Sequence, residues 1–297
     1  MSSSLSIAIV GGGNVGSSFA LKLVNVGKHN VTVVARPDSK RLAQLRDHGI
    51  ITTKGESCKV AVADSLDVTI PYDLVIVTAA GYQVEHLLPL YKESAGRIFL
   101  FLFNIYSPER LRDMFGERAA FGFPVVQATM DDNGLLQYKF KFSMASPLSD
   151  QRCVDIFKSS DIPAALKPKM LLWKRCHSCL AMAAIGVHTA GKRHGAGAGA
   201  TWQESRTVVA GLHAGFALTT SLGYPLYHTI FKVVNSVPTP IMTGLAWLFS
   251  RMKWPREQLG TSSSELEHHE VVDSMIAAAQ QSNKLSLVPA FQAIKSL

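Results

Sequence analysis

Cysteine is scarce in this sequence, and charge and long apolar runs are limited as well. Four cysteines in 297 residues (Cys58, Cys153, Cys176 and Cys179) are too few for a disulfide scaffold, so we expect a reducing, cytoplasmic compartment. Cys176 and Cys179 have CxxC spacing, but no second pair of ligands follows at the spacing of a zinc site. Neither a metal centre nor a disulfide framework is therefore expected.

Charged residues make up only 18% of the chain, and the basic ones are scattered rather than gathered in a dense run among aromatic residues. The net charge of +8 is then better explained by an anionic small-molecule ligand than by nucleic acid. The longest stretch without charge, 207–231, contains two histidines, three glycines and Pro225, which suits a buried helix better than a membrane span. The first seven residues lack the basic and apolar regions of a signal peptide. We expect neither a membrane nor a nucleic-acid partner.

Apolar residues form 47% of the chain, and its length is sufficient for two domains. The first begins with an apolar run at 6–10 that stops at Gly11-Gly-Gly-Asn-Val-Gly16. Apolar residues then recur at helical spacing until Gly27, and a β-branched run follows at 31–35. Strand, glycine turn, helix and strand in this order predict a dinucleotide-binding motif.

The spacing of the glycines follows from the chemistry of a pyrophosphate site. Gly11 permits the tight turn, Gly13 lets the backbone approach the pyrophosphate, and Gly16 lets the helix pack closely on the strand. The helix N-terminus, with Asn14 and Val15, presents backbone N–H groups and a partial positive charge to the phosphates.

The second strand ends at Arg36, where an NAD-binding protein usually carries an acidic residue. A carboxylate would repel the 2′-phosphate of NADPH, whereas a guanidinium can hold it with paired hydrogen bonds. Lys40 and Arg41 follow closely. We therefore expect NADPH as the cofactor; a solvated surface arginine is the alternative interpretation of Arg36.

Two further apolar runs, 74–78 and 98–103, are typical of strands buried on both faces of a parallel sheet. Helical patterns separate the runs, so we expect an α/β Rossmann-type, doubly wound parallel sheet. Ligands of such sheets lie beyond the carboxyl ends of the strands, where Thr78, Ala79 and Asn104 are found.

The second half of the chain is rich in Ala, Leu and Met, and it predicts a C-terminal all-α domain with helices near 169–190, 201–222, 239–250, 264–282 and 287–296. Two prolines, Pro163 and Pro168, indicate the boundary. We predict an NADP-binding domain over 1–165 and a helical substrate or dimerisation domain over 166–297. The apolar helices would suit a homodimer interface, and equally the core of one domain.

The order of these features resembles the ketopantoate reductase (2-dehydropantoate 2-reductase) family. The segments that carry the resemblance are Ile7–Gly16, Val34–Arg36, Val75–Thr78, Phe103–Asn104, Leu172–Arg175, Ser264–Glu265 and Val288–Pro289. The resemblance implies a biosynthetic, NADPH-dependent oxidoreductase that reduces a 2-oxo group to a 2-hydroxy group, with a lysine of the first helix of the second domain as the proton donor. It also implies that Asn104 contacts substrate and nicotinamide, and that Glu265 contacts the cofactor ribose.

The helix that would carry the catalytic lysine departs from the family pattern. The family lysine lies two residues after the tryptophan, a position held here by Arg175, and Lys174 precedes it. Arginine stays protonated and is a poor proton donor, whereas a lysine is a better acid but lies about 100° away on the helix. His177 is a third candidate.

The expected substrate contacts depart in the same way. The family asparagine one turn further along corresponds to Cys179, or to Ser178 if the register follows the lysine at 174. The family's later serine has no match here except Arg251, and Ala80 replaces a family lysine. We therefore expect a changed small-molecule substrate, anionic or a carbonyl or imine compound. The alternative function is a catalytically inactive NADPH-binding sensor or partner protein of the same fold.

Overall fold

The structure, a computed structural model, describes residues 4–140, 144–195, 197–253 and 265–297. The chain divides into two compact units. The first contains residues 1–103 and 109–170, and the second contains residues 104–108 and 171–297. The short segment Asn104–Pro108 thus belongs to the second unit although residues of the first unit flank it on both sides.

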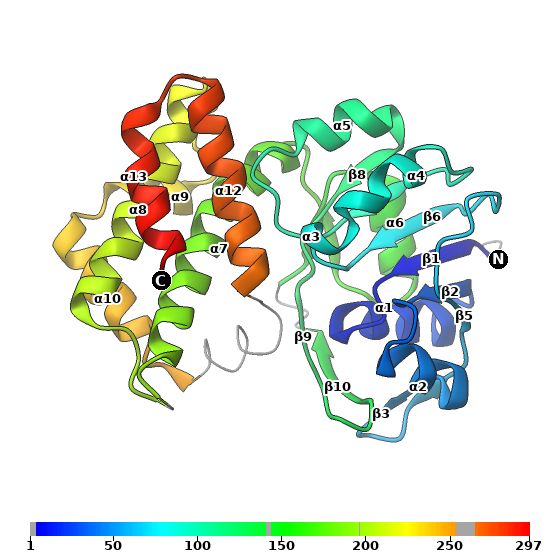
Figure 1. Cartoon of the computed structure of the whole chain (residues 1–297). Helices are drawn as coiled ribbons and strands as arrows, with labels where there is room; N and C mark the ends of the chain where they lie inside the picture. Colours follow the sequence, from blue (N-terminus) through cyan, green and yellow to red (C-terminus); the bar gives the residue numbers. More distant parts are fainter. Residues whose placement is uncertain (1–3, 141–143, 196, 254–264) are drawn as a thin grey trace. The chain divides into compact units, whose positions relative to one another are not determined.

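A six-stranded sheet forms the centre of the first unit (Figure 1). Its strands are β1 (Ser6–Val10), β2 (Asn30–Val34), β5 (Ala61–Ala63), β6 (Leu74–Val77), β7 (Phe99–Phe101) and β8 (Ala119–Phe121). Every neighbouring pair is parallel, and the order β5-β2-β1-β6-β7-β8 is that of a Rossmann fold. The connection reverses between β1 and β6, so the point where such sheets bind ligands lies at the ends of these strands. The predicted doubly wound parallel sheet is confirmed.

Helices and 3₁₀ turns connect these strands. They are α1 (Asn14–Asn25), α2 (Lys40–His48), α3 (Gly81–Val84), η1 (Glu85–Leu87), α4 (Leu88–Lys92), α5 (Glu109–Phe115), η2 (Gly116–Arg118) and α6 (Gln151–Ser159). Side chains fix two of the starts: Ser39 Oγ accepts from the backbone N–H of Leu42 at α2, and the Asp150 carboxylate accepts from that of Arg152 at α6. Each of these caps therefore defines the residue at which its helix begins.

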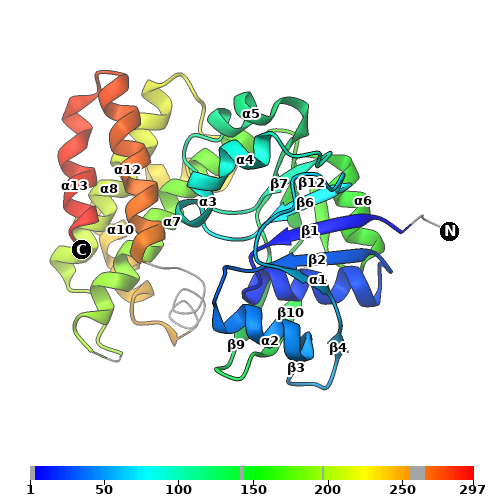
Figure 2. The same ribbon diagram turned by 45° about the vertical axis from the view of Figure 1, so that its right-hand side comes forward.

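Two smaller sheets complete the first unit, and the sequence did not predict them. One has the order β4 (Ser57–Cys58), β3 (Ile50–Thr52), β10 (Leu135–Phe140) and β9 (Val126–Met130); the other pairs β11 (Ser146–Leu148) with β12 (Ala164–Leu166). Helix α1 lies beside β2 and also contacts β9 and β10 (Figure 2). Phe19 of α1 stacks on Phe140 and packs against Phe157, so this helix joins the two layers through a shared apolar core.

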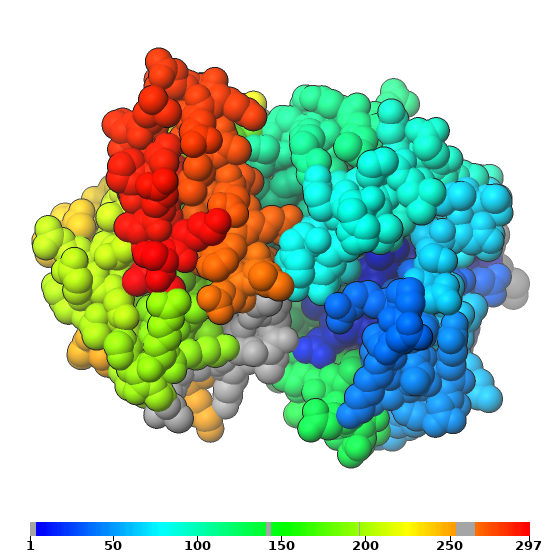
Figure 3. Space-filling model, in the orientation of Figure 1, coloured from blue at the N-terminus to red at the C-terminus, as the bar shows by residue number. Residues whose placement is uncertain are grey.

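The second unit is helical, as predicted. Among its described residues, the helices are α7 (Met170–Lys192), α8 (Trp202–Ser221), α9 (Thr229–Ser236), α10 (Thr239–Phe249), α12 (Glu265–Gln281) and α13 (Val288–Lys295), with the 3₁₀ turn η3 (Leu285–Leu287) before the last. Thr201 and Glu204 form a capping box at the start of α8. Helices α12 and α13 lie side by side at the surface (Figure 3). Among the helices of the described ranges, none combines the length and apolarity that a membrane crossing requires.

Candidate cofactor loop and lysine cluster

The loop after β1 requires glycine at two of its positions. Gly11 has φ 111°, and a Cβ there would lie 2.7 Å from Thr78 Oγ1. A Cβ on Gly16 would lie 1.9 Å from the carbonyl oxygen of Gly11, so α1 can pass this close to the strand only with glycine. Thr78 Oγ1 donates to the carbonyl oxygens of Val10 and Gly11 at 3.1 and 2.9 Å. These contacts hold the loop in a fixed shape.

The start of α1 is suited to an anion. Gly13, the N-cap residue, is exposed, and a Cβ there would meet nothing within 4 Å. As a glycine, the N-cap residue has no capping side chain, and the first turn, with Asn14 and Val15, contains no acidic residue. A helix N-terminus of this kind presents backbone N–H groups to a phosphate. The first-unit residues that the sequence assigns to a pyrophosphate therefore fit one sterically and electrostatically.

Two arginines lie on the segment from β2 to α2. Arg36 is exposed, and its carbonyl oxygen accepts a 2.7 Å hydrogen bond from Ser39 Oγ. Arg41 is half-buried against the loop itself: its Nε donates to the Gly12 carbonyl oxygen at 2.9 Å and its Nη2 to Ser17 Oγ at 3.0 Å. The sequence gives no sign that Arg41, rather than Lys40 beside it, reaches the loop.

In the second unit, Asn104, Lys174 and Glu267 form a buried polar cluster. Asn104 Nδ2 donates to Glu267 Oε1 at 2.8 Å. Glu267 is 8% exposed and Lys174 is 3% exposed, and the two side chains interact electrostatically. Glu265, which the resemblance assigns to the cofactor ribose, is exposed at the first residue of α12, and Glu267 is the glutamate that meets Asn104.

Burial changes the proton affinity of this cluster. It lowers the pKa of Lys174 to about 7, and the negative charge of Glu267 partly opposes this fall. Burial also raises the pKa of the Glu267 carboxyl, against the effects of the Asn104 hydrogen bond and the Lys174 charge. A lysine with a pKa near the working pH can both donate and recover a proton. Such a perturbed group is typical of a catalytic site.

Arg175 has a different environment, although it is also only 3% exposed. Its guanidinium carbon lies 4.8 Å from the ring centre of Tyr106 and 4.1 Å from that of Tyr224. Both aromatic rings therefore hold the cation through cation–π contacts. Helix α7 is buried around most of its circumference, so neighbouring residues 100° apart are both withdrawn from solvent.

The remaining candidates on α7 lie near these two residues. His177 stacks on Trp173 at 4.5 Å, and burial, reinforced by the Lys174 charge, lowers its pKa to about 3. His177 is therefore neutral near pH 7. Cys179 is buried, and its thiol donates to the Arg175 carbonyl oxygen. Ser178, one turn after Lys174, is 1% exposed, and its Oγ has no hydrogen-bond partner among the described residues.

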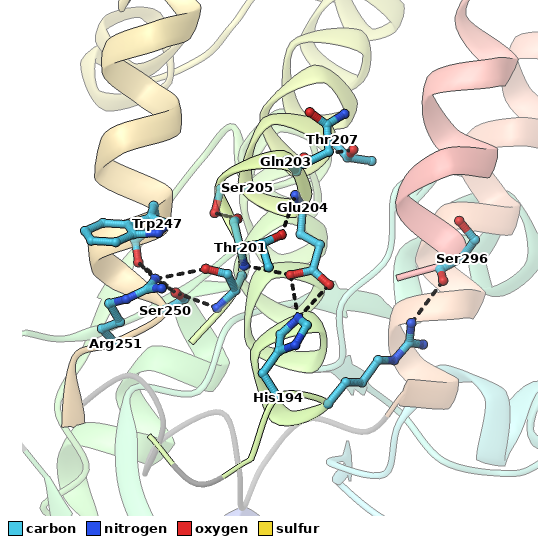
Figure 4. Close-up of polar contacts among 12 residues, drawn as sticks. His194, Thr201, Gln203, Glu204, Ser205, Thr207, Trp247, Ser250, Arg251 and Ser296 are labelled. Carbon is cyan, nitrogen blue, oxygen red and sulfur yellow. Dashed lines mark hydrogen bonds and ion pairs between the residues drawn. The ribbon is translucent and has the colours of Figure 1, made fainter. Parts of the chain in front are cut away.

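Arg251 lies in another part of the helical unit (Figure 4). Its Nη1 donates to the carbonyl oxygens of Ala200 and Trp247, each at 2.9 Å, and its guanidinium carbon lies 3.8 Å from the Trp247 ring centre. Next to it, His194 Nε2 lies 2.9 Å from both carboxylate oxygens of Glu204. These contacts fasten the start of α8 to the end of α10, so Arg251 is engaged in structural bonds. The described residues contain no cluster of three or more potential metal ligands.

Comparisons with known proteins agree with the fold. The family model of ketopantoate reductase PanE/ApbA matches residues 7–145. A D-mandelate dehydrogenase solved with NADH and anilino(oxo)acetate is 15% identical, with a TM-score of 0.70, over 98% of this chain and 96% of that one. The PanE/ApbA family ketopantoate reductase of Ralstonia eutropha JMP134 is 17% identical, with a TM-score of 0.70 and the same coverage.

A probable 2-dehydropantoate 2-reductase of Bacillus subtilis is 18% identical, with a TM-score of 0.64, over 98% of this chain and 99% of that one. No curated protein matches the chain significantly. These solved structures are of oxidoreductases, and at such identities they establish the fold. The resemblance expected from the sequence is confirmed: residues 7–145 match the family model of ketopantoate reductase PanE/ApbA, and the chain has the fold of that family's solved structures.

Proposed function

We propose that this protein is an NADPH-dependent reductase that transfers hydride to a 2-oxo acid, ketone or imine, with a substrate different from that of the family. The observation that carries the proposal is the buried cluster of Lys174, Glu267 and Asn104 in the helical unit. Burying a lysine costs a fold free energy, so its presence in the core favours a functional role. Its pKa of about 7 is suited to proton transfer near neutral pH.

When bound, a nicotinamide cofactor would supply the hydride. The residues that would hold its phosphates are Gly11, Gly13 and Gly16 with the N–H groups of α1, and Arg36 would pair with the 2′-phosphate. The exposed N-cap glycine of α1 and a first turn without an acidic residue support this assignment. We assign Thr78 and Ala79 to the same cofactor site, since Thr78 Oγ1 donates to the carbonyl oxygens of Val10 and Gly11 at the start of the loop.

Lys174 is assigned the proton transfer. In this mechanism its ammonium Nζ donates a proton to the carbonyl oxygen as the carbon receives hydride, and water restores the proton afterwards. Glu267 holds the ammonium form by its charge, which raises the lysine pKa from the value that burial alone would give. Asn104 uses one amide N–H on Glu267, so its second N–H and its carbonyl oxygen can orient substrate or nicotinamide.

The surroundings of Lys174 support a changed substrate. Ser178 presents a buried hydroxyl on the same side of α7 as Lys174, since residues four apart share a helix face. Arg175, at the family lysine position, is held between two tyrosine rings. The family's asparagine corresponds to Cys179, or to Ser178 if the register follows Lys174, and both residues are buried. A thiol or a hydroxyl in place of an amide alters which polar group of a substrate is recognised.

The test is to measure NADPH and NADH binding, followed by NADPH oxidation with ketopantoate, phenylglyoxylate, other 2-oxo acids and cyclic imines. We expect NADPH to bind more tightly and to be oxidised by one of these compounds more rapidly than by ketopantoate. Faster turnover of ketopantoate than of the whole panel would contradict the changed substrate. Binding without turnover of any compound would favour the inactive sensor. If neither dinucleotide binds, the proposed function is wrong.

A further inference from the structure

Arg41 is a half-buried cation that is attached to the glycine loop. Besides its bonds to Gly12 and Ser17, its Nη1 lies 3.5 Å from the carbonyl oxygen of Gly134 in the β9–β10 turn. Gln44, one turn further along α2, donates from Nε2 to the carbonyl oxygen of Asp132 in the same turn. The guanidinium therefore has a fixed position, set by three elements that meet around it.

No carboxylate neutralises this cation within the described ranges. The groups that contact Arg41 are two carbonyl oxygens and one hydroxyl, and burial lowers its pKa to about 10. By comparison, Arg46 on the same helix is exposed and pairs with Asp64 at 3.6 Å. A guanidinium has five N–H groups, and three contacts leave two of them for another acceptor. A partly desolvated charge without a counter-ion favours the binding of an anion.

The position of Arg41 indicates which part of a dinucleotide this anion belongs to. A Cβ on Gly12 would lie 2.9 Å from Leu45 Cδ1 and 3.2 Å from Val33 Cγ1, so this part of the loop faces β2 and α2. In a Rossmann fold, the residue at the end of the second strand selects between the ribose hydroxyl and its 2′-phosphate. Arg36 follows that strand, and the Arg36–Ser39 turn leads directly into the helix that carries Arg41.

We propose that Arg41 is a specificity-determining residue whose guanidinium provides, beside Arg36, the second cation for the 2′-phosphate of NADPH. This inference rests on the proposed function. Arg41 is attached to the loop and therefore needs little ordering when the phosphate arrives, whereas the exposed Arg36 must be immobilised. The two arginines thus have different tasks: the fixed one defines the position of the phosphate, and the exposed one adds a second positive charge.

The experiment compares dissociation constants for NADPH, NADH, adenosine 2′,5′-bisphosphate and AMP in the wild type and in Arg41→Gln. We expect NADPH and the bisphosphate to bind about ten- to a hundred-fold more weakly to the variant, the range for loss of hydrogen bonds to a charged group. NADH and AMP should bind within about twofold of the wild type, by the same reasoning. Arg46→Gln, on the same helix, is the matched control and should change none of the four values.

Two results would overturn the inference. An equal loss for NADPH and NADH would show that Arg41 only supports the loop, and an unchanged NADPH affinity would show that it has no role. Arg41→Lys keeps the charge without the planar fork; it should lose part of the NADPH affinity and none of the NADH affinity, so it serves if Arg41→Gln fails to fold. Failure of the proposed function itself appears separately, as a wild type that binds neither dinucleotide.

Discussion

Replacing Lys174 with methionine removes the buried ammonium while keeping an unbranched side chain of similar length. If Lys174 is the proton donor, hydride transfer should slow by about a hundred- to ten-thousand-fold, the usual contribution of a general acid. That loss corresponds to about 3–5 kcal/mol of transition-state stabilisation. NADPH binding should not change, because the loop that would hold the phosphates belongs to the other unit. The measurement is single-turnover NADPH oxidation with the best substrate of the panel.

The pH dependence makes this prediction specific to Lys174. A proton donor must be protonated to act, so the rate should be level below the pKa of about 7 and fall above it. At about pH 9, only about one molecule in a hundred would retain the proton, and the rate should fall about a hundred-fold from its value at about pH 6. A lysine with the ordinary pKa of 10.5 would show no decrease over this range.

Lys192→Met provides the matched control, since Lys192 is exposed in the last turn of the same helix. It should keep the wild-type rate and the wild-type pH profile. The assignment of Lys174 is refuted if the wild-type rate is constant up to about pH 9, or if Lys174→Met retains the falling limb. A deuterium isotope effect with NADPH labelled at the transferred position shows that the profile reports hydride transfer.

Three further predictions concern the cluster, the loop and the helical unit. Glu267→Gln removes a charge that raises the pKa of Lys174, so the falling limb of the rate profile should move to lower pH; a shift to higher pH would contradict the electrostatic argument. Gly16→Ala places a Cβ 1.9 Å from the Gly11 carbonyl oxygen and should abolish NADPH binding in calorimetric titration, whereas wild-type affinity would show that the loop shifts freely. Thr201→Ala removes the cap of α8 and should lower the free energy of unfolding by about 1 kcal/mol in urea titration without changing NADPH affinity; an unchanged stability would mean that solvent satisfies the cap.

The elements that the sequence predicted are those with a strong local pattern. The run before Gly11 and the β-branched run after Gly27 became β1 and β2 because strands buried on both faces need continuous apolar residues. The small sheets escaped prediction because β3, β4, β11 and β12 have only two or three residues each, and β9 has no fully buried residue. In the large sheet, β5 was missed because it has three residues, none of them fully buried. Helix α9 was missed because it has only eight residues, with Phe231 its one buried side chain.

The candidate site divides in a similar way. The glycines of the loop are predictable because a backbone requirement determines the residue type at each position. The choice between Lys174 and Arg175 is not, because α7 is surrounded by other elements and periodicity does not distinguish its faces. Glu265 and Glu267 differ by two positions, and only tertiary contact shows which one meets Asn104. Likewise, only the tertiary structure shows that Arg41 contacts the glycine loop.

The segment Asn104–Pro108 has a consequence for how the protein is made. Tyr106 is completely buried in the core of the helical unit, and its hydroxyl is hydrogen-bonded with Thr219. The ribosome therefore releases one piece of the helical core long before the helices that enclose it. A polypeptide that starts at Leu171 would lack the aromatic ring around which those helices close and would leave a tyrosine-sized hole. The helical unit should accordingly complete its core only after its last helices have been made, with Tyr106 already waiting in the earlier part of the chain.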